Sequence, residues 1–149
     1  MKAIQDYYLK ENAHCFGCGY ENHEGYQIKS YPEGDEAICH FTADSKYSGG
    51  FPESLYGGLI ASLIDCHAAA AAAWGKHKEQ GLDIKTEPLK RFVTASLKVD
   101  YLKPVPTEVQ LELRARIKKI ENRKVFVEVT LGADEDIKAK GEVLMIQLP

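Results

Sequence analysis

Hydrophobic and polar residues alternate along several stretches of the chain. Residues 26–31 and 37–41 alternate, and Pro32-Glu33-Gly34-Asp35 between them consists of turn-forming residues, so we predict an early β-hairpin. In the second half of the chain the same period returns in four runs, at 97–101, 109–117, 125–131 and, more weakly, 137–145. Asn122-Arg123 and Asp134-Glu135-Asp136 separate the last three runs as turns. The pattern therefore predicts two strands and, later, four consecutive strands.

A long apolar stretch, Gly57 to Gly75, lies between these two groups of strands. It is apolar on more than one side, and its alanine run 68–73 allows close approach by neighbouring elements. We predict a helix capped by Ser54 and surrounded by protein. Much of the stretch is Ala and Gly, and it contains an Asp and a His, so a buried helix is favoured over a membrane span.

Four consecutive strands that each have one apolar face form an antiparallel sheet, which must cover that face. The central helix is the only element apolar enough to cover it. We therefore predict an α+β fold in which a curled antiparallel sheet of about six strands wraps around one long helix. The length of 149 residues fits a single domain over 1–149, with residues 1–24 packed on it as an N-terminal segment.

The net charge is -3 and the charged residues are interspersed, which favours neither nucleic acid nor an anionic membrane as a partner. The N-terminus has no apolar stretch of the signal-peptide type, so we expect a cytoplasmic protein with reduced thiols. The four cysteines are then not a disulfide framework.

Asp65 is the first candidate for chemistry, because an unpaired carboxylate in the most apolar part of a chain costs several kcal/mol. The alternative is a carboxylate satisfied by a buried cation or by the backbone. His67 lies two positions further on and points about 200° around the helix from Asp65. We interpret His67 as a core or interface residue with satisfied ring nitrogens.

Gly57 and Gly58 form the second candidate, at the start of the predicted helix. First-turn amides have no intrahelical acceptor and favour negative charge, so they can hold the oxyanion of an attacked thioester carbonyl. The alternative is a glycine pair needed only for packing. Gly57 and Asp65 stand about 12 Å apart along the axis, too far to act on one carbonyl carbon. If both are catalytic, the site is shared by two antiparallel helices across a twofold axis.

The segment Leu55-Tyr56-Gly57-Gly58-Leu59-Ile60-Ala61-Ser62-Leu63-Ile64-Asp65 resembles the helix motif of the phenylacetate-degradation type and THEM4-like hot-dog thioesterases. That family opens its helix with His-Gly-Gly and has Asp seven residues after the second glycine. Further segments resemble the same family. These are His14-Cys15-Phe16-Gly17-Cys18-Gly19 with Asn22 and Gly25, the loop Gly50-Phe51-Pro52, and Val93-Thr94-Ala95 with Tyr101-Leu102-Lys103-Pro104.

The resemblance implies a hot-dog fold and hydrolysis of acyl-CoA thioesters, without a cofactor, by a homodimer or a dimer of dimers. The resemblance implies that Asp65 acts as the nucleophile or as the general base. It also implies that the Gly57 amide polarises the thioester carbonyl and that Thr94 orients water or the carboxylate. The candidate substrate-binding residues are Tyr56, Gly58, Phe51 and Ser96.

Two features depart from the family pattern. Tyr56 replaces the usual His, and a phenol can donate a hydrogen bond but does not titrate near neutral pH. In an unbroken strand Thr94 would share its face with Ser96 rather than with Leu97 and Val99, so a bulge or a position at a subunit interface is needed to bring Thr94 to the site.

Three other functions compete with hydrolysis. A hot-dog protein that binds acyl-CoA without hydrolysing it is the main alternative, because of Tyr56. His14, Cys15, Cys18 and His23 could form a zinc site, but a second distant ligand pair is missing, so we expect no metal. We do not favour a hydratase of the same fold, because the sequence has no Asp/His pair at the spacing that such a site would need.

Five basic residues flank predicted strand ends, and we interpret them as solvated surface charges. They are Lys90, Arg91, Lys103, Arg123 and Lys124.

Overall fold

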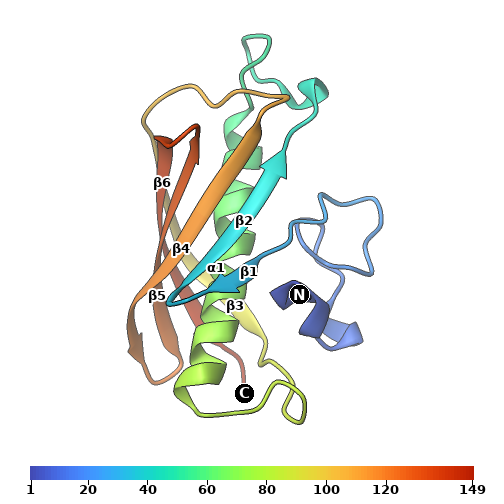
Figure 1. The fold of residues 1–149 in the computed structure, drawn as a ribbon, viewed down its shortest axis with the longest axis vertical. Coiled ribbons are helices and arrows are strands. Elements are labelled where there is room, and N and C mark those ends of the chain that lie inside the picture. The colour runs from blue at the N-terminus through green and yellow to red at the C-terminus, as the bar shows by residue number, and fades with distance from the viewer.

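The computed structural model describes residues 1–149 (Figure 1). One long helix, α1 (Gly57–Glu79), lies against a six-stranded antiparallel sheet with the order β1-β2-β4-β5-β6-β3. The strands are β1 (Tyr31–Glu33), β2 (Glu36–Thr42), β3 (Phe92–Tyr101), β4 (Gln110–Glu121), β5 (Lys124–Ala133) and β6 (Asp136–Gln147). Three short 3-10 helices complete the chain, at Ile4–Tyr7, Lys10–Asn12 and Ser45–Tyr47.

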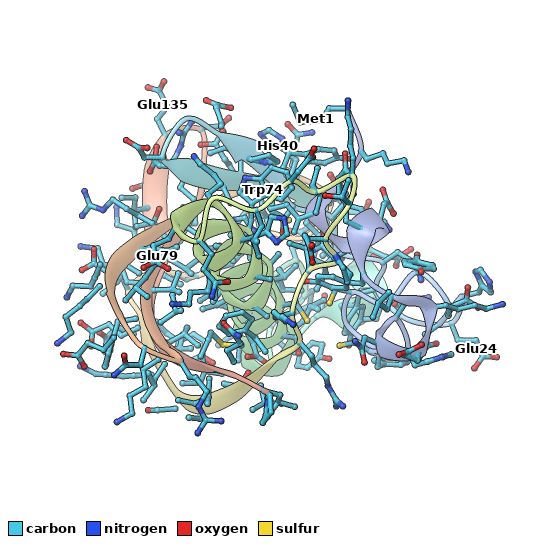
Figure 2. All side chains as sticks on the ribbon, turned by 90° about the horizontal axis from the view of Figure 1, so that it is seen from below. Met1, Glu24, His40, Trp74, Glu79 and Glu135 are labelled. Carbon is cyan, nitrogen blue, oxygen red and sulfur yellow. The ribbon has the colours of Figure 1, made fainter.

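The sheet curls around α1, as the view from below in Figure 2 shows. Leu59, Leu63 and Ile64 are fully buried between the helix and the sheet. By length and composition α1 could cross a membrane, but 61% of its most apolar window is buried inside the fold. The prediction of a curled sheet around one core helix is confirmed.

Ile64 packs over a glycine of β6, where a Cβ atom on Gly141 would collide with its side chain. The glycine lets the helix come close to the sheet at the position next to Asp65 in sequence. Close contact here fixes the depth at which the helix sits on β6.

The turns predicted between the last three strands are also confirmed. Asn122 (φ 54°), Asp134 (φ 50°) and Glu135 (φ 64°) all adopt the left-handed conformation there. Asn and Asp tolerate this conformation better than most residues, which is why they mark tight hairpins in a sequence.

The predicted first strand at 26–31 is wrong, because regular pairing begins only at Tyr31, opposite Ile38 of β2. The backbone before it is bonded elsewhere: the amide of Tyr26 donates to Phe16 O (2.9 Å) and that of Ile28 to Gly17 O (3.0 Å). These amides serve the N-terminal segment instead of the sheet, so residues 26–30 are not a strand.

Ser54 does not cap α1. The N-cap residue is Tyr56, with extended backbone (φ −70°, ψ 147°) and no side-chain cap. Ser54 lies two residues earlier, where its carbonyl accepts from Gly49 N (2.7 Å) and its backbone forms a bridge with Pro106. This pairing holds Ser54 outside the first helical turn.

The N-terminal segment is tied to α1 and β2 by a buried polar network. Gln5 Nε2 donates to Ser30 Oγ (3.0 Å), and Ser30 N donates to Gln5 Oε1 (2.8 Å). Ser30 Oγ lies 2.8 Å from His67 Nδ1, and His67 Nε2 lies 2.9 Å from Ala37 O. A carbonyl only accepts, so Nε2 carries the proton and Nδ1 accepts from Ser30. Burial lowers the pKa of His67 to about 4, so it is neutral at pH 7, as expected of a satisfied core histidine.

Candidate active site

Asp65 projects from α1 toward the edge strand β3, where Thr94 Oγ1 donates a hydrogen bond to Asp65 Oδ1 at 2.5 Å. The contact depends on a bulge in β3, since Thr94 pairs with Met145 but Ser96 pairs with the next residue, Leu144. The extra residue reverses the alternation of the strand. The required bulge is therefore present, and Thr94 faces the helix.

The carboxylate of Asp65 is half-buried and has no Lys, Arg or His partner within 4.0 Å. Desolvation by burial raises its pKa, while the hydrogen bond from Thr94 acts in the opposite direction and the charge of Cys15 raises it further. The alternative of a carboxylate neutralised by a buried cation is thus not found. Oδ1 is held by Thr94, and Oδ2 has no partner within the chain.

A cavity of about 430 Å³ opens beside Asp65 and Thr94. One side is the N-terminal segment and the other is the start of β3 with the residues before it. The residues that line the cavity include His14, Cys15, Cys18, Asp65, Cys66, Lys90, Arg91, Thr94 and Met145. The space is large enough for a small organic group to reach the carboxylate.

The first turn of α1 forms a second polar feature, about 12 Å along the axis from Asp65. The amides of Gly57 and Gly58 are exposed and donate to no acceptor in the chain. Tyr101 Oη donates to Gly57 O (2.9 Å), and the ring of Tyr56 covers Gly58 so closely that a Cβ there would clash. The helix start therefore presents free N–H donors framed by two tyrosines.

Tyr56 is held by another phenol, since its Oη lies 2.7 Å from Tyr26 Oη. Tyr26 packs edge-on against Phe16 (5.2 Å between ring centroids) and Tyr47 (5.5 Å). The hydrogen bond with Tyr56 and burial raise the pKa of Tyr26 to about 12. The phenol that replaces the family histidine is thus oriented by Tyr26, which lies between the N-terminal segment and β1.

The structure brings some of the predicted site residues together and separates others. Asp65 and Thr94 are in contact, whereas Tyr56, Gly57 and Gly58 lie at the start of the helix, about two turns before Asp65. Phe51 is 78% exposed in the loop before α1.

Ser96 does not join Thr94, because the bulge turns it to the outer surface of the sheet. There it lies beside Lys98, Lys118 and Phe126. The role of Ser96 in substrate binding stays a prediction.

Sequence reasoning missed Cys66, the residue after Asp65. Its thiol meets those of Cys15 and Cys18, and the three sulfur atoms all lie within 4.8 Å of one another. Hydrogen bonding with Cys18 and Cys66 lowers the pKa of Cys15 to about 2, and the contact with Cys15 raises the pKa of Cys18 to about 12. The two histidines once considered with the cysteines, His14 and His23, are not part of this cluster.

The interpretation of Lys90 and Arg91 as solvated strand-end charges agrees with their position just before β3. Both are exposed, form no ion pair, and line the cavity of Asp65. No local pattern distinguishes them from other surface cations, because only the return of the chain after α1 brings them to Asp65. Lys103, by contrast, is paired with Asp136 at 2.7 Å.

Comparisons with known proteins agree with this geometry. The profile of the thioesterase superfamily matches residues 53–140, which hold both Asp65 and the helix start. A thioesterase superfamily protein from Shewanella loihica PV-4 is 37% identical and superimposes with a TM-score of 0.69 over 87% of this chain and 97% of that one. An uncharacterised protein from Pyrococcus horikoshii, 17% identical, has the same fold, with a TM-score of 0.68 over 99% of this chain and 95% of that one.

Two curated relatives are named acyl-coenzyme A thioesterase THEM4. The protein from Rattus norvegicus is 30% identical over 79% of this chain and 46% of its own length, and that from Xenopus laevis is 29% identical over 74% and 45%. The chain thus spans about half the length of the curated relatives it matches. With the family profile over more than half of its residues and a six-stranded sheet curled around one helix, the chain belongs to the hot-dog thioesterase superfamily.

Proposed function

We propose that this protein hydrolyses acyl-CoA thioesters to a free acid and coenzyme A. The observation that carries the proposal is Asp65, a carboxylate without a cationic partner that one hydrogen bond from Thr94 holds at the edge of a cavity. A partly desolvated carboxylate with one free oxygen can take a proton from water or attack a carbonyl itself. Names of the curated relatives point to the same substrate class.

The reaction follows from these atoms. On the general-base route Asp65 Oδ2 removes a proton from water, whose oxygen attacks the thioester carbon, and the C–S bond breaks as the sulfur leaves as the thiolate of coenzyme A. On the nucleophilic route Oδ2 attacks the thioester carbon, and the C–S bond breaks as the thiolate of coenzyme A leaves. Water then cleaves the resulting mixed anhydride to the free acid and the Asp65 carboxylate. In both, the carbonyl oxygen becomes an oxyanion that needs donors, which we assign to the amide of Gly57.

The Gly57 donor has to come from a second copy of the chain, because Asp65 and Gly57 of one helix are too far apart. Strand β3 is an unpaired edge of the sheet, and its helix-facing Leu97 (38%) and Tyr101 (54%) are exposed, as is Leu102 (52%) just after the strand. An exposed edge with apolar side chains favours pairing with another chain. We therefore propose a homodimer with two equivalent sites.

Lys90 and Arg91 suggest how the coenzyme is held. Both line the cavity of Asp65 and have no carboxylate partner, so they are free to meet phosphate groups. We assign them to the coenzyme rather than to the acyl group. A cytoplasmic location, where acyl-CoA is available, fits this proposal.

Binding of acyl-CoA without hydrolysis is the competing function, and Tyr56 is the observation that favours it. Its hydroxyl is engaged by Tyr26, so it does not act as the imidazole of the family would. The two functions differ in turnover, which an assay over short-chain, medium-chain and aryl-CoA thioesters measures directly.

The sharpest test is subunit complementation. Asp65→Asn and Gly57→Pro each remove one half of the shared site, so each homodimer should be inactive. A mixed dimer carries one site with both halves intact and should recover about half the activity of the wild type. A wild type that turns over no thioester above background would contradict hydrolysis. Active wild type without recovery in proven mixed dimers would contradict the shared site.

A further inference from the structure

Three of the four cysteines meet at the junction between the N-terminal segment and α1. Cys15 and Cys18 come from the segment and Cys66 from the helix, and their sulfur atoms lie within 4.8 Å of one another. Cys15 Sγ and Cys66 Sγ, 51 positions apart in the sequence, are separated by 3.8 Å. The fourth cysteine, Cys39, is buried in β2 outside this cluster.

The spacing of the sulfur atoms fits metal ligands. Two thiolates on one tetrahedral cation with metal–sulfur bonds of about 2.3 Å stand about 3.8 Å apart. A disulfide would require about 2.05 Å. The separation of Cys15 and Cys66 therefore matches two corners of a tetrahedron, and the sulfur of Cys18 lies within 4.8 Å of both.

The loop that carries Cys15 and Cys18 is shaped to reach the helix. A side chain on Gly17 would collide with the sulfur of Cys66, and one on Gly19 would collide with the backbone at Ala13 and Cys15. Gly19 N also donates to Cys15 O at 2.8 Å, which closes a tight turn around the two thiols. The glycines of this Cys-Phe-Gly-Cys-Gly segment are thus required by the approach of its thiols to Cys66.

The surroundings suit a cation with one open position. Cys18 and Cys66 are buried, while Cys15 is exposed and all three line the cavity that holds Asp65. Three protein ligands leave the fourth position of a tetrahedral ion for water.

We propose that Cys15, Cys18 and Cys66 bind one thiophilic divalent cation of the zinc class, with its fourth position open to the cavity of Asp65. Binding releases the protons that the thiols still carry and involves no redox change. The ion joins the N-terminal segment to α1 beside the proposed catalytic carboxylate. This ligand set replaces the sequence-based expectation of no metal, which considered Cys15 and Cys18 with two histidines and left out Cys66.

The test uses the full chain, purified with reductant and without chelator, and the probes Zn²⁺ and Co²⁺. After anaerobic loading with Zn²⁺ and desalting, elemental analysis should give one zinc per chain. Co²⁺ should give the near-ultraviolet thiolate-to-cobalt absorption and the visible bands of a tetrahedral site. Cys66→Ser should weaken binding by more than about 100-fold, since even outer-shell changes cost 10- to 100-fold.

Cys39→Ser is the matched control, because it removes a buried thiol outside the cluster and should keep one cation per chain. If Cys66→Ser fails to fold, Cys15→Ser at the exposed position carries the same test. Absence of the thiolate-to-cobalt absorption in wild type, equal binding by the variants, or a disulfide within the cluster in protein purified anaerobically would each overturn the proposal. None of these readouts depends on hydrolysis.

Discussion

Thr94 Oγ1 and Asp65 Oδ1 are joined by a 2.5 Å hydrogen bond between an edge strand and the central helix. The bulge between Thr94 and Ser96 creates this contact by reversing which residues of β3 face α1. One local irregularity thus decides which hydroxyl meets the carboxylate. The assignment of Thr94 as an orienting residue can be tested independently of the hydrolysis assay for Asp65.

Thr94→Val should lower kcat of thioester hydrolysis by about 10- to 100-fold, because a hydrogen bond to a charged group contributes about 1.5–3 kcal/mol. KM should change little, since the hydroxyl holds Asp65 rather than the substrate. Thr94→Ser keeps the donor and should restore most of kcat. Equal loss in the Val and Ser variants would show that packing, not the hydroxyl, matters.

Gly57→Pro should reduce kcat by about 100-fold or more, because it deletes the amide assigned to the oxyanion. Gly57 is the first helical residue, where proline is tolerated, and Tyr56 before it already has the extended backbone that proline requires. Gly57→Ala is the matched control: it adds a Cβ at 3.4 Å from the Tyr101 ring but keeps the N–H. If both variants lose activity equally, steric contact with Tyr101 explains the effect and the oxyanion role is wrong.

Tyr26 and Tyr56 should be energetically coupled through their 2.7 Å contact. In a double-mutant cycle with Tyr26→Phe and Tyr56→Phe, we expect a coupling of about 0.5–1.5 kcal/mol in the free energy of unfolding. Urea denaturation of the four proteins measures it. A coupling near zero would mean that the two hydroxyls prefer water to each other.

Gly141→Ala should destabilise the fold by about 1–3 kcal/mol, because the added methyl group would collide with the side chain of Ile64. Ile64→Ala alone should cost about 2–5 kcal/mol by leaving a cavity. In the double variant the methyl group added at position 141 fills space left by the truncated side chain at position 64. The double variant should therefore lose clearly less unfolding free energy than the sum of the two single losses. Additive losses, measured by urea unfolding, would place the two side chains in separate environments.

Ser30→Ala should cost about 1–3 kcal/mol, because it removes the donor to His67 Nδ1 and an acceptor for Gln5 inside the core. Ser45→Ala, at an exposed serine whose hydroxyl has no bonded partner, should change the unfolding free energy by less than about 0.5 kcal/mol. Similar values for the two serines would show that the buried network adds no net stability.

Much of the fold could be predicted because apolar residues recur along the chain with clear helical and strand periods. The helix and the last four strands each repeat their apolar positions often enough to reveal which face is buried. The early strand failed for a physical reason: the amides of Tyr26 and Ile28 are bonded to the N-terminal segment, and no alternation of side chains reports where a backbone amide finds its acceptor. The prediction that Ser54 caps the helix failed for a similar reason, because the backbone of Ser54 is paired with neighbouring loop residues.

By itself, the sequence determined the core helix, the hairpin order and the isolated carboxylate at position 65, because local period and the cost of burying a charge are both encoded residue by residue. Only the tertiary structure decided that a bulge brings Thr94 but not Ser96 to that carboxylate, and that Cys66 meets Cys15 and Cys18. These relationships join segments from 29 to 51 positions apart. Their geometry depends on how strands and loops close around the helix, which no local pattern of residues specifies.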